Sequence, residues 1–336
     1  MHPLVVPARA LAPVLSLQGE RRLVVGAPLG RGSQGTVYVA RMDQAVATRK
    51  DGEEVLSRNV ALKVVDEALL HDQEAIFELR RATRRSALVS HTNVVTVSEW
   101  FVAQMREGSE PVPCIVQELV AGMSLASFLA RYELAQRRVP LDLALFIACE
   151  IAEGLAGARQ TTSIEGTMLN IAHHDLSPRQ VLLSWNGDVK VGDFGYRPAG
   201  GMTSGVRRAD HDARAQGVHM APEVARGARG DGRSDVFSLG VILHEMLYGP
   251  RFPKGAGARD VIDHARAGYV HHPVVAPNVP RAVADVVARA LEVDPRARQA
   301  HAGILAYDLR REALALGVAD SRVFLRTALF EMSESR

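Results

Sequence analysis

The strongest constraint on the fold is a glycine-rich segment with strand-forming residues on both sides. Gly30, Gly32 and Gly35 lie in GRGSQG, which follows the apolar run at Leu23 and precedes the β-formers Val37–Val39. A dinucleotide-binding fingerprint must open a helix, whereas TVYVA is typical of a strand. A hairpin with a glycine loop can instead lay backbone N–H groups over a polyphosphate, because no side chains obstruct the approach.

The predicted secondary structure changes near Gly122. Before it, apolar β-forming runs predict strands, among them NVALKVV, and apolar periodicity predicts one long helix over Glu67–Val89. After it helices dominate, with Ser124, Asp142 and Ser234 as predicted N-caps.

One short strand pair, VLLS and DVKVGDF, is predicted within the helical part, joined by a turn at Asn186–Gly187. The fold class is therefore α+β and bilobal, with a small β-rich lobe at 22–121 and a larger α-helical lobe at 122–312. An N-terminal extension (1–21) and a C-terminal helical tail (313–336) complete the expected organisation. The tail contains VFLRTALFEM, which is typical of an amphipathic helix packed on the large lobe or on a partner.

Composition excludes several classes of protein. The 336 residues carry 40 Lys+Arg and 38 Asp+Glu, a net charge of +2, with 47% hydrophobic residues. Extended disorder and a dedicated nucleic-acid binder are excluded on these values. The longest apolar stretch, Leu141–Ala158, contains three acidic residues, so no membrane segment is predicted. Cys114 and Cys149 lie in apolar contexts without metal-ligand spacing, and we expect reduced thiols and a cytoplasmic protein.

Three further segments carry residue types suited to phosphate chemistry. Lys63 lies in VALK, on an otherwise apolar strand, where a lone lysine is as often a solvated strand residue. Asp193 begins DFG at the end of the short strand pair, and its carboxylate can hold Mg²⁺ together with phosphates. Asp175 lies in HHDLSPRQ, 18 residues before Asp193 with the hairpin between them.

The order GxGxxGxV, VALK, HxDLxP, DFG and APE resembles the protein kinase family over about residues 22–312. Ala221–Glu223 supplies APE, SDVFSLG places Asp235 at the start of a helix, and DPRAR supplies Arg298, which the family pairs with the APE glutamate, here Glu223. The DLSP wording and the polar approach to it resemble a bacterial branch of the Ser/Thr kinases.

The resemblance implies a role for each matching residue, with ATP and Mg²⁺ as cofactors and a protein as substrate. Lys63 would hold the α- and β-phosphates, Asp193 would ligate Mg²⁺ with Gln180, and Asp175 would accept the proton of the substrate hydroxyl. Glu78 is expected to pair with Lys63, although counting back from HTNVV points to Ala82 instead. The residues implied in nucleotide binding are Gly30, Gly32, Gly35, Val37, Ala61, Lys63, Gln117, Glu118 and Val120.

The chain departs from the family pattern at several positions. Gln180 stands where the family has asparagine, Ser177 replaces a lysine near the γ-phosphate, and His174 replaces the arginine that receives activation-loop phosphate. Gln216 and His219 replace the usual Thr and Tyr before APE. Thr203 and Ser204, in the same segment, are candidate phosphorylation sites or ordinary loop hydroxyls.

Three functions remain open on the sequence. The first is an ATP- and Mg²⁺-dependent protein serine/threonine kinase, and the second is a pseudokinase that binds nucleotide as a regulatory or scaffold module. A small-molecule phosphotransferase is disfavoured, because APE, Asp235 and Arg298 build a platform for protein substrates in the family. The oligomeric state is not predicted.

Overall fold

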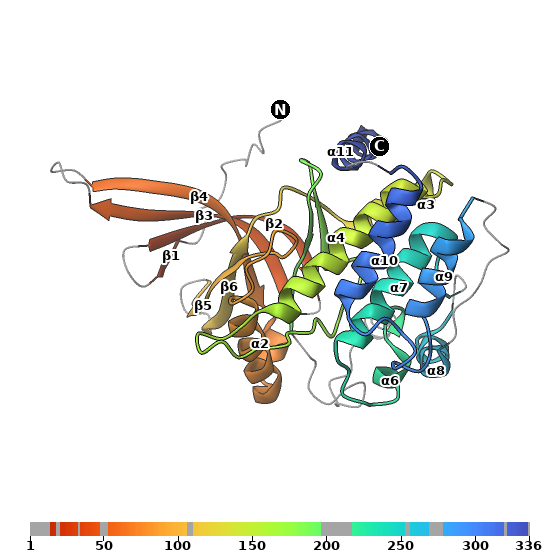
Figure 1. Ribbon diagram of the computed structural model, residues 1–336. Coiled ribbons are helices and arrows are strands. Elements are labelled where there is room, and N and C mark those ends of the chain that lie inside the picture. Colours follow the sequence, from red (N-terminus) through yellow and green to blue (C-terminus); the bar gives the residue numbers. More distant parts are fainter. Residues whose placement is uncertain are drawn as a thin grey trace. The chain divides into compact units, whose positions relative to one another are not determined.

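The computed structural model describes residues 14–17, 21–32, 34–47, 53–105, 110–195, 217–252, 256–268, 278–318 and 321–334. They form two compact units (Figure 1). The first contains the described residues up to Ala87 together with Thr96–Leu119, and the second contains Leu88–Val95 and the described residues from Val120 onward. One unit is built on a sheet and the other on helices, which confirms the α+β bilobal fold class.

The first unit is an antiparallel sheet of six strands in the order β1-β2-β3-β4-β6-β5. The strands are β1 (Val14–Leu17), β2 (Arg21–Gly32), β3 (Gly35–Ala47), β4 (Glu53–Val65), β5 (Val97–Ala103) and β6 (Val112–Glu118). The apolar core of this unit includes Leu23, Met42, Val60, Leu62 and Val116. Because side chains alternate along a strand, Ala61 and Lys63 of β4 point to the opposite face from Val60 and Leu62.

The helix predicted over Glu67–Val89 is two helices in the structure. Helix α1 (Glu67–Leu70) ends at His71, and α2 (Gln73–Ser86) begins after Asp72. The Asp72 carboxylate accepts a hydrogen bond from the backbone N–H of Ala75 at 2.9 Å. This N-cap starts a new helix where apolar periodicity alone predicts continuity. The single-helix prediction was therefore wrong.

The second unit is mainly helical and contains a small antiparallel sheet in the order β7-β8-β9. Its strands are β7 (Gly122–Ser124), β8 (Val181–Ser184) and β9 (Val189–Val191). Its helices are α3 (Leu125–Leu134), α4 (Leu141–Gln160), α6 (Pro222–Ala225), α7 (Gly232–Tyr248), α8 (Ala258–Ala267), α9 (Arg281–Ala290), α10 (Ala302–Ala315) and α11 (Arg322–Glu334). The β8–β9 hairpin turns at Asn186–Gly187, as predicted, with Gly187 at a φ of 88°.

The predicted N-caps hold in part. Ser124 caps α3, and its hydroxyl accepts a hydrogen bond from Ser127 N–H. Asp231, rather than Ser234, is the N-cap of α7, and Ser234 bonds back to the backbone of Asp231 as the third residue of a capping box. Asp142 lies in the first turn of α4 and does not cap it, because the helix begins directly after Pro140.

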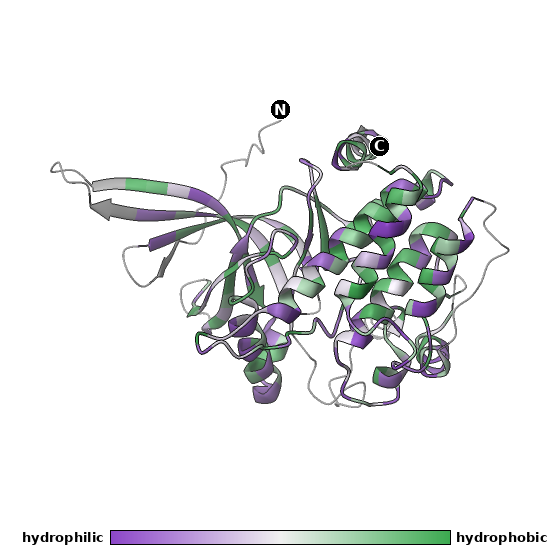
Figure 2. Ribbon diagram, viewed as in Figure 1, coloured by the Kyte–Doolittle hydropathy of each residue, from purple (hydrophilic) through white to green (hydrophobic). Residues whose placement is uncertain are grey.

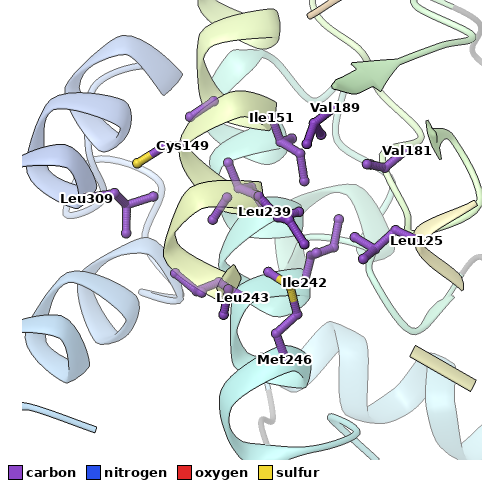
Figure 3. Packing of buried hydrophobic residues seen from close by; sticks show 14 of the residues in the cluster. Leu125, Cys149, Ile151, Val181, Val189, Leu239, Ile242, Leu243, Met246 and Leu309 are labelled. Atoms are coloured by element: carbon purple, nitrogen blue, oxygen red, sulfur yellow. The ribbon is translucent and has the colours of Figure 1, made fainter. Parts of the chain in front are cut away.

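Helices α4 and α7 form the centre of the second unit, and both are apolar on nearly all sides. Leu145, Ile151, Leu239 and Ile242 are completely buried. Figure 3 shows Ile151, Leu239, Leu243 and Met246 packed together, and Figure 2 shows apolar residues along both helices. Among the helices in the described part of the chain, none has the length and apolar character needed to cross a membrane.

Helix α11 packs on the second unit, beside α3 and the β8–β9 turn. Leu325, Leu329 and Met332 are buried in the same apolar core as α4 and α7. The Trp185 and Phe330 rings lie 6.1 Å apart, and the Arg131 guanidinium donates to the Met332 carbonyl. The C-terminal amphipathic segment therefore covers this unit itself.

Candidate active site

The predicted residues of the first unit form two rows across the sheet. Gly30 pairs with Val37, and Val37 pairs with Lys63, so these three lie in line across β2, β3 and β4. Two residues before Lys63 on β4, Ala61 pairs with Gln117 of β6. Lys63 and Ala61 lie on the same face because they are two residues apart on one strand. Five predicted nucleotide-binding residues are thus brought together by strand pairing alone.

The glycine-rich loop closes the β2–β3 hairpin between the paired residues Gly32 and Gly35. Gly35 has a φ of 152°, and a Cβ there would lie 2.0 Å from the Val64 carbonyl oxygen. Only glycine fits such a close approach of β3 to β4. The loop is thereby held against the strand that carries Lys63.

The Lys63 ammonium donates a hydrogen bond to Gln34 Oε1 at 2.6 Å. Gln34 lies in the glycine-rich loop, and both residues are buried, with 6% and 4% of their surfaces exposed for Gln34 and Lys63. The sequence motifs predict a role for Lys63 and none for Gln34. No local pattern could have found Gln34, because the contact depends on how the loop folds over β4.

Glu78 lies on α2, where its carboxylate accepts hydrogen bonds from the Arg81 guanidinium at 2.7 and 3.1 Å. Ala82, the alternative position, is buried one turn further along α2. The expected pairing of Glu78 with Lys63 stays a prediction.

The candidate adenine-binding segment begins at the end of β6. Glu118 pairs with Val60, and its N–H donates to the Thr96 carbonyl at 2.8 Å. The Glu118 carboxylate in turn accepts from Thr96 N–H at 3.2 Å. These bonds fix the backbone that leads into Val120, where the chain returns to the second unit.

In the second unit, one buried carboxylate holds the segment that contains Asp175. Asp235, in the first turn of α7, accepts the backbone N–H of His173 at 2.7 Å and that of His174 at 2.9 Å. Asp235 has only 3% of its surface exposed. The His174 backbone has a φ of 72°, a conformation costly for a residue with a side chain. The two charge-assisted bonds stabilise this turn.

The His173 ring joins the Asp175 segment to the DFG segment. Its Nε2 lies 2.8 Å from the Gly192 carbonyl oxygen, and its Nδ1 accepts from Asp175 N–H at 3.3 Å. The ring is also 4.8 Å from that of Phe194. Complete burial lowers the pKa of His173 to about 4, so the ring is neutral near pH 7. The two bonds then place the single proton on Nε2.

The β8–β9 hairpin brings together the two predicted metal ligands, Gln180 and Asp193. Gln180 immediately precedes β8, Asp193 follows β9 by two residues, and Val181 pairs with Val191. The Gly192 N–H donates to the Gln180 carbonyl oxygen at 2.9 Å. Asp193 has a φ of 59°, so its carboxylate is carried on a sharp bend beside this bond.

Two departures from the family pattern contact each other. The Ser177 hydroxyl donates to the Gln180 side-chain oxygen, and Gln180 N–H donates to the Ser177 carbonyl at 3.0 Å. A carboxamide oxygen has two lone pairs, so one remains available on Gln180. The sequence identified both positions but not their contact.

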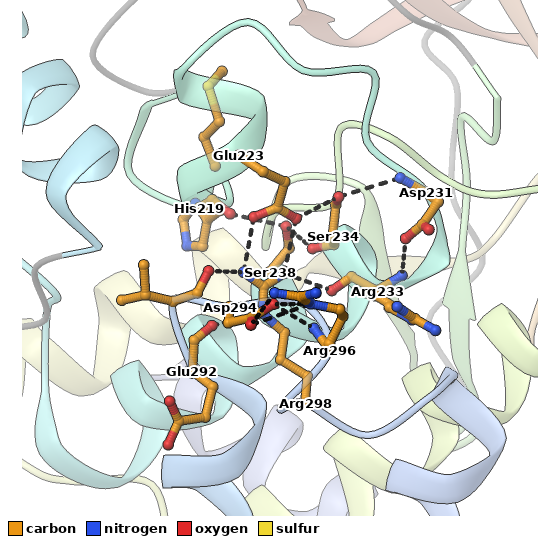
Figure 4. A network of polar contacts seen from close by, with 12 residues as sticks. His219, Glu223, Asp231, Arg233, Ser234, Ser238, Glu292, Asp294, Arg296 and Arg298 are labelled. Carbon is orange, nitrogen blue, oxygen red and sulfur yellow. Dashed lines mark hydrogen bonds and ion pairs between the residues drawn. The ribbon is translucent and has the colours of Figure 1, made fainter.

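The predicted pair of Glu223 and Arg298 is confirmed (Figure 4). Two parallel hydrogen bonds of 2.8 Å join the guanidinium to the carboxylate. The Ser234 hydroxyl adds a third bond to the carboxylate, at 2.7 Å. Burial raises the pKa of Glu223, but the hydrogen bonds from Arg298 and Ser234 outweigh it and leave the pKa below its ordinary value.

Residues 218–220, just before APE, are held in place by side chains of the second unit. Arg251 is completely buried and donates to the carbonyls of Val218 and Met220 at 2.8 and 3.1 Å. His219 Nε2 lies 2.9 Å from the Glu245 carboxylate. Burial lowers the pKa of Arg251 to about 10, while Glu245 acts against this shift. Sequence reasoning missed Arg251 and Glu245, since each contacts this segment only through the fold.

Three of the positions singled out in the sequence, Thr203, Ser204 and Gln216, lie outside the described residues. The predicted site residues themselves all lie within the described residues. Those from Gly30 to Glu118 belong to the first unit, and those from Val120 to Asp193 belong to the second.

Comparison with known proteins agrees with this geometry. A family model described as protein tyrosine and serine/threonine kinase matches residues 23–307. The tyrosine-protein kinase MasK of Myxococcus xanthus is 31% identical over 72% of this chain and 35% of its own length. The serine/threonine-protein kinase PrkC of Bacillus subtilis is 28% identical over 80% of this chain and 37% of its own length. PknB of Mycobacterium leprae, also named a serine/threonine-protein kinase, is 31% identical over 68% and 32%.

The chain belongs to the protein kinase family, of the eukaryotic-like type that these bacterial proteins represent. It spans about a third of the length of the curated relatives that it matches.

Proposed function

We propose that this protein is an ATP- and Mg²⁺-dependent protein serine/threonine kinase. The observation that carries the proposal is the buried network around His173, which ties the backbone of Asp175 to that of Gly192, next to Asp193. Phosphoryl transfer depends on positioning and charge stabilisation more than on covalent chemistry. A network that fixes these two carboxylate-bearing segments suits that requirement.

Asp175 is the proposed catalytic base, which accepts or orients the proton of the acceptor hydroxyl. Its segment is fixed from both sides, by Asp235 at the backbone of His173 and His174 and by the neutral His173 ring. Lys63, buried on β4, is the proposed ligand of the α- and β-phosphates. Val37, Ala61 and Gln117, beside it in the sheet, are proposed to line the nucleotide site.

The donor set fits Mg²⁺. Asp193 offers carboxylate oxygens and Gln180 a carboxamide oxygen, and Mg²⁺ commonly takes one or two protein ligands and completes its shell with phosphates and water. Within the described residues there is no group of three or more His, Cys, Asp or Glu that could hold a metal by itself. A bound Mg²⁺ supplies positive charge that offsets the charge on the phosphates.

A protein acceptor is proposed on account of the Glu223–Arg298 network and the support beneath residues 218–220. These contacts build a fixed surface directly before APE, which a small-molecule phosphotransferase does not need. Serine or threonine as acceptor follows the names of PrkC and PknB, whereas MasK is named a tyrosine kinase. Phosphoamino-acid analysis of the product distinguishes the two.

The second candidate function is a pseudokinase that binds nucleotide without transferring phosphate. The contact of Ser177 with Gln180 favours it, because that bond engages an oxygen proposed for the metal. His174 weakens the site further, since a histidine offers at most a partly protonated imidazole where the family has arginine. In this case ATP raises the melting temperature, but no turnover follows.

The test is a phosphate-transfer assay with Mg²⁺ and ATP on the protein and on a generic protein substrate. The wild type is expected to transfer phosphate, and Asp175→Asn and Asp193→Ala to abolish transfer. ATP-dependent stabilisation of the wild type without transfer would select the pseudokinase. Retained activity in Asp175→Asn would show that the base is elsewhere.

A cytoplasmic location is also proposed, since Cys114 and Cys149 are buried free thiols.

A further inference from the structure

The glycine-rich loop carries one side chain that reaches the proposed phosphate ligand. Gln34 Oε1 lies 2.6 Å from Lys63 Nζ, and both side chains are removed from solvent. We propose that Gln34 is a further residue of the nucleotide site: its carboxamide binds the Lys63 ammonium when no nucleotide is present, and the phosphates of a nucleoside di- or triphosphate displace it. The inference rests on the proposed function, because it takes Lys63 as a phosphate ligand.

The position of the Gln34 carboxamide is built into the hairpin. The Gln34 carbonyl accepts the backbone N–H of Asp66 at 2.9 Å, which anchors the loop to the end of β4. Asp66 also forms an ion pair with Arg31, which lies in the same loop as Gln34. Gly35, the next residue, lies so close to the same end of β4 that a Cβ there would be 2.0 Å from the Val64 carbonyl oxygen. With its own carbonyl and the following residue held against β4, Gln34 is held where its side chain reaches Lys63.

The chemistry makes Gln34 a competitor of the phosphate. A neutral carboxamide oxygen and an anionic phosphate oxygen both accept from the ammonium, and the anion binds more strongly. The phosphate therefore displaces the carboxamide from Lys63. Because the Gln34–Lys63 hydrogen bond is lost in this exchange, the net affinity of the protein for the nucleotide is lower than it would be without Gln34. Adenosine carries no phosphate and does not compete for Lys63. Gln34 thus lowers affinity only for the phosphorylated ligands.

Two substitutions separate this role from a general effect on the loop. Gln34→Met keeps the length of the side chain and removes the acceptor. Gln34→Glu keeps the shape and replaces the carboxamide by a carboxylate, which binds Lys63 more strongly and repels phosphate. Calorimetric titration with Mg²⁺-ADP and with adenosine measures both ligands on the same preparations, and thermal unfolding without ligand verifies that each variant is folded.

Relative to wild type, Gln34→Met is expected to bind ADP about tenfold to a hundredfold more tightly, in keeping with one hydrogen bond to a charged group. Gln34→Glu is expected to bind ADP at least about tenfold more weakly. The affinity for adenosine should stay within about twofold in both. Unchanged or weaker ADP binding by Gln34→Met would overturn the inference alone, provided that the wild type binds ADP. Failure of all three proteins to bind ADP would overturn the proposed function as well.

Discussion

Arg298 places its guanidinium against the Glu223 carboxylate in a two-bond arrangement, and its side chain has no solvent-exposed surface. The same guanidinium donates to the backbone carbonyls of Arg233, Glu292 and Val293 and lies 4.8 Å from the centre of the Phe237 ring. Three segments of the second unit, α6, α7 and the connection between α9 and α10, therefore meet at one cation. Its removal takes the two guanidinium hydrogen bonds from the half-buried Glu223 carboxylate, which keeps the bond from Ser234, and leaves several carbonyls without this donor.

Arg298→Met is expected to lower the free energy of unfolding by about 3–5 kcal/mol, the usual cost of removing one partner of a buried ion pair. Arg296→Met is the matched control, because Arg296 pairs with Asp294 at the surface and 84% of its side chain is exposed. Urea titrations of both variants measure the difference. Equal stability of the two variants would mean that the buried pair contributes nothing to the fold.

Stability should fall as the solution is acidified from about pH 6.5 to about pH 4 on account of His173. Its pKa is lowered to about 4 in the fold and is 6.5 in the unfolded chain. Because the unfolded state binds the proton first as pH falls, this contribution is complete above pH 6.5 and is lost toward pH 4. The loss is about 3 kcal/mol at full extent.

Urea titrations at pH 7.5 and pH 5 measure this effect in wild type and in His173→Gln, which cannot titrate. The stability of the variant should depend less on pH over this range. His71→Gln, at an exposed position, serves as control and should keep the wild-type dependence. A wild-type slope in His173→Gln would assign the pH dependence to other groups.

Asp235→Asn should reduce phosphate transfer with little effect on nucleotide affinity. An amide NH₂ cannot accept a hydrogen bond, so one of the two bonds from His173 and His174 is lost without a change of shape. A misplaced catalytic segment lowers kcat about tenfold to a hundredfold. The KM for ATP should change by less than about twofold, since no proposed phosphate ligand is touched.

Asp231→Asn is the control for this experiment. Asp231 caps the same helix, and asparagine caps a helix as well as aspartate does. Its rate should equal that of the wild type. Equal losses in both variants would point to general destabilisation of α7.

Ser177 and Gln180 should behave as a coupled pair. Ser177→Ala removes the hydroxyl that donates to the Gln180 oxygen, and Gln180→Asn shortens the side chain so that the bond cannot form as it does now. We expect Ser177→Ala to lower the Mg²⁺ concentration needed for half-maximal transfer about twofold to tenfold in the wild-type background, because the lost hydrogen bond frees the Gln180 oxygen. In the Gln180→Asn background the same substitution should have little effect. Additive changes in the double variant would show that the two side chains act independently.

The elements that sequence could predict are those set by local chemistry. The Asn186–Gly187 turn predicts the β8–β9 hairpin, because few residues adopt the backbone that such a turn requires. A run of apolar β-forming residues predicts the strand that carries Lys63, and the motif order predicts Glu223 opposite Arg298. In each case the pattern itself contains the physical cause.

What sequence could not predict are contacts created when distant segments fold together. Gln34 lies in an ordinary glycine-rich loop, and its partner is 29 residues away. Arg251 follows the end of α7, where an arginine is expected to be exposed to solvent. In the structure it is completely buried and donates to the carbonyls of Val218 and Met220. The break between α1 and α2 was predictable in principle, because Asp72 is a common N-cap residue that apolar periodicity ignores.

The family match ends at residue 307, inside α10, but the apolar core of the second unit continues into α11. Leu325 and Leu329 are completely buried, and a Cβ on Gly187 would lie 2.5 Å from the Arg322 carbonyl oxygen. A chain that ends where the family match ends would expose an apolar surface along α3 and around Trp185 to solvent. Recombinant versions of this protein should therefore retain the sequence through Glu334, or they will be prone to aggregate for reasons unrelated to catalysis.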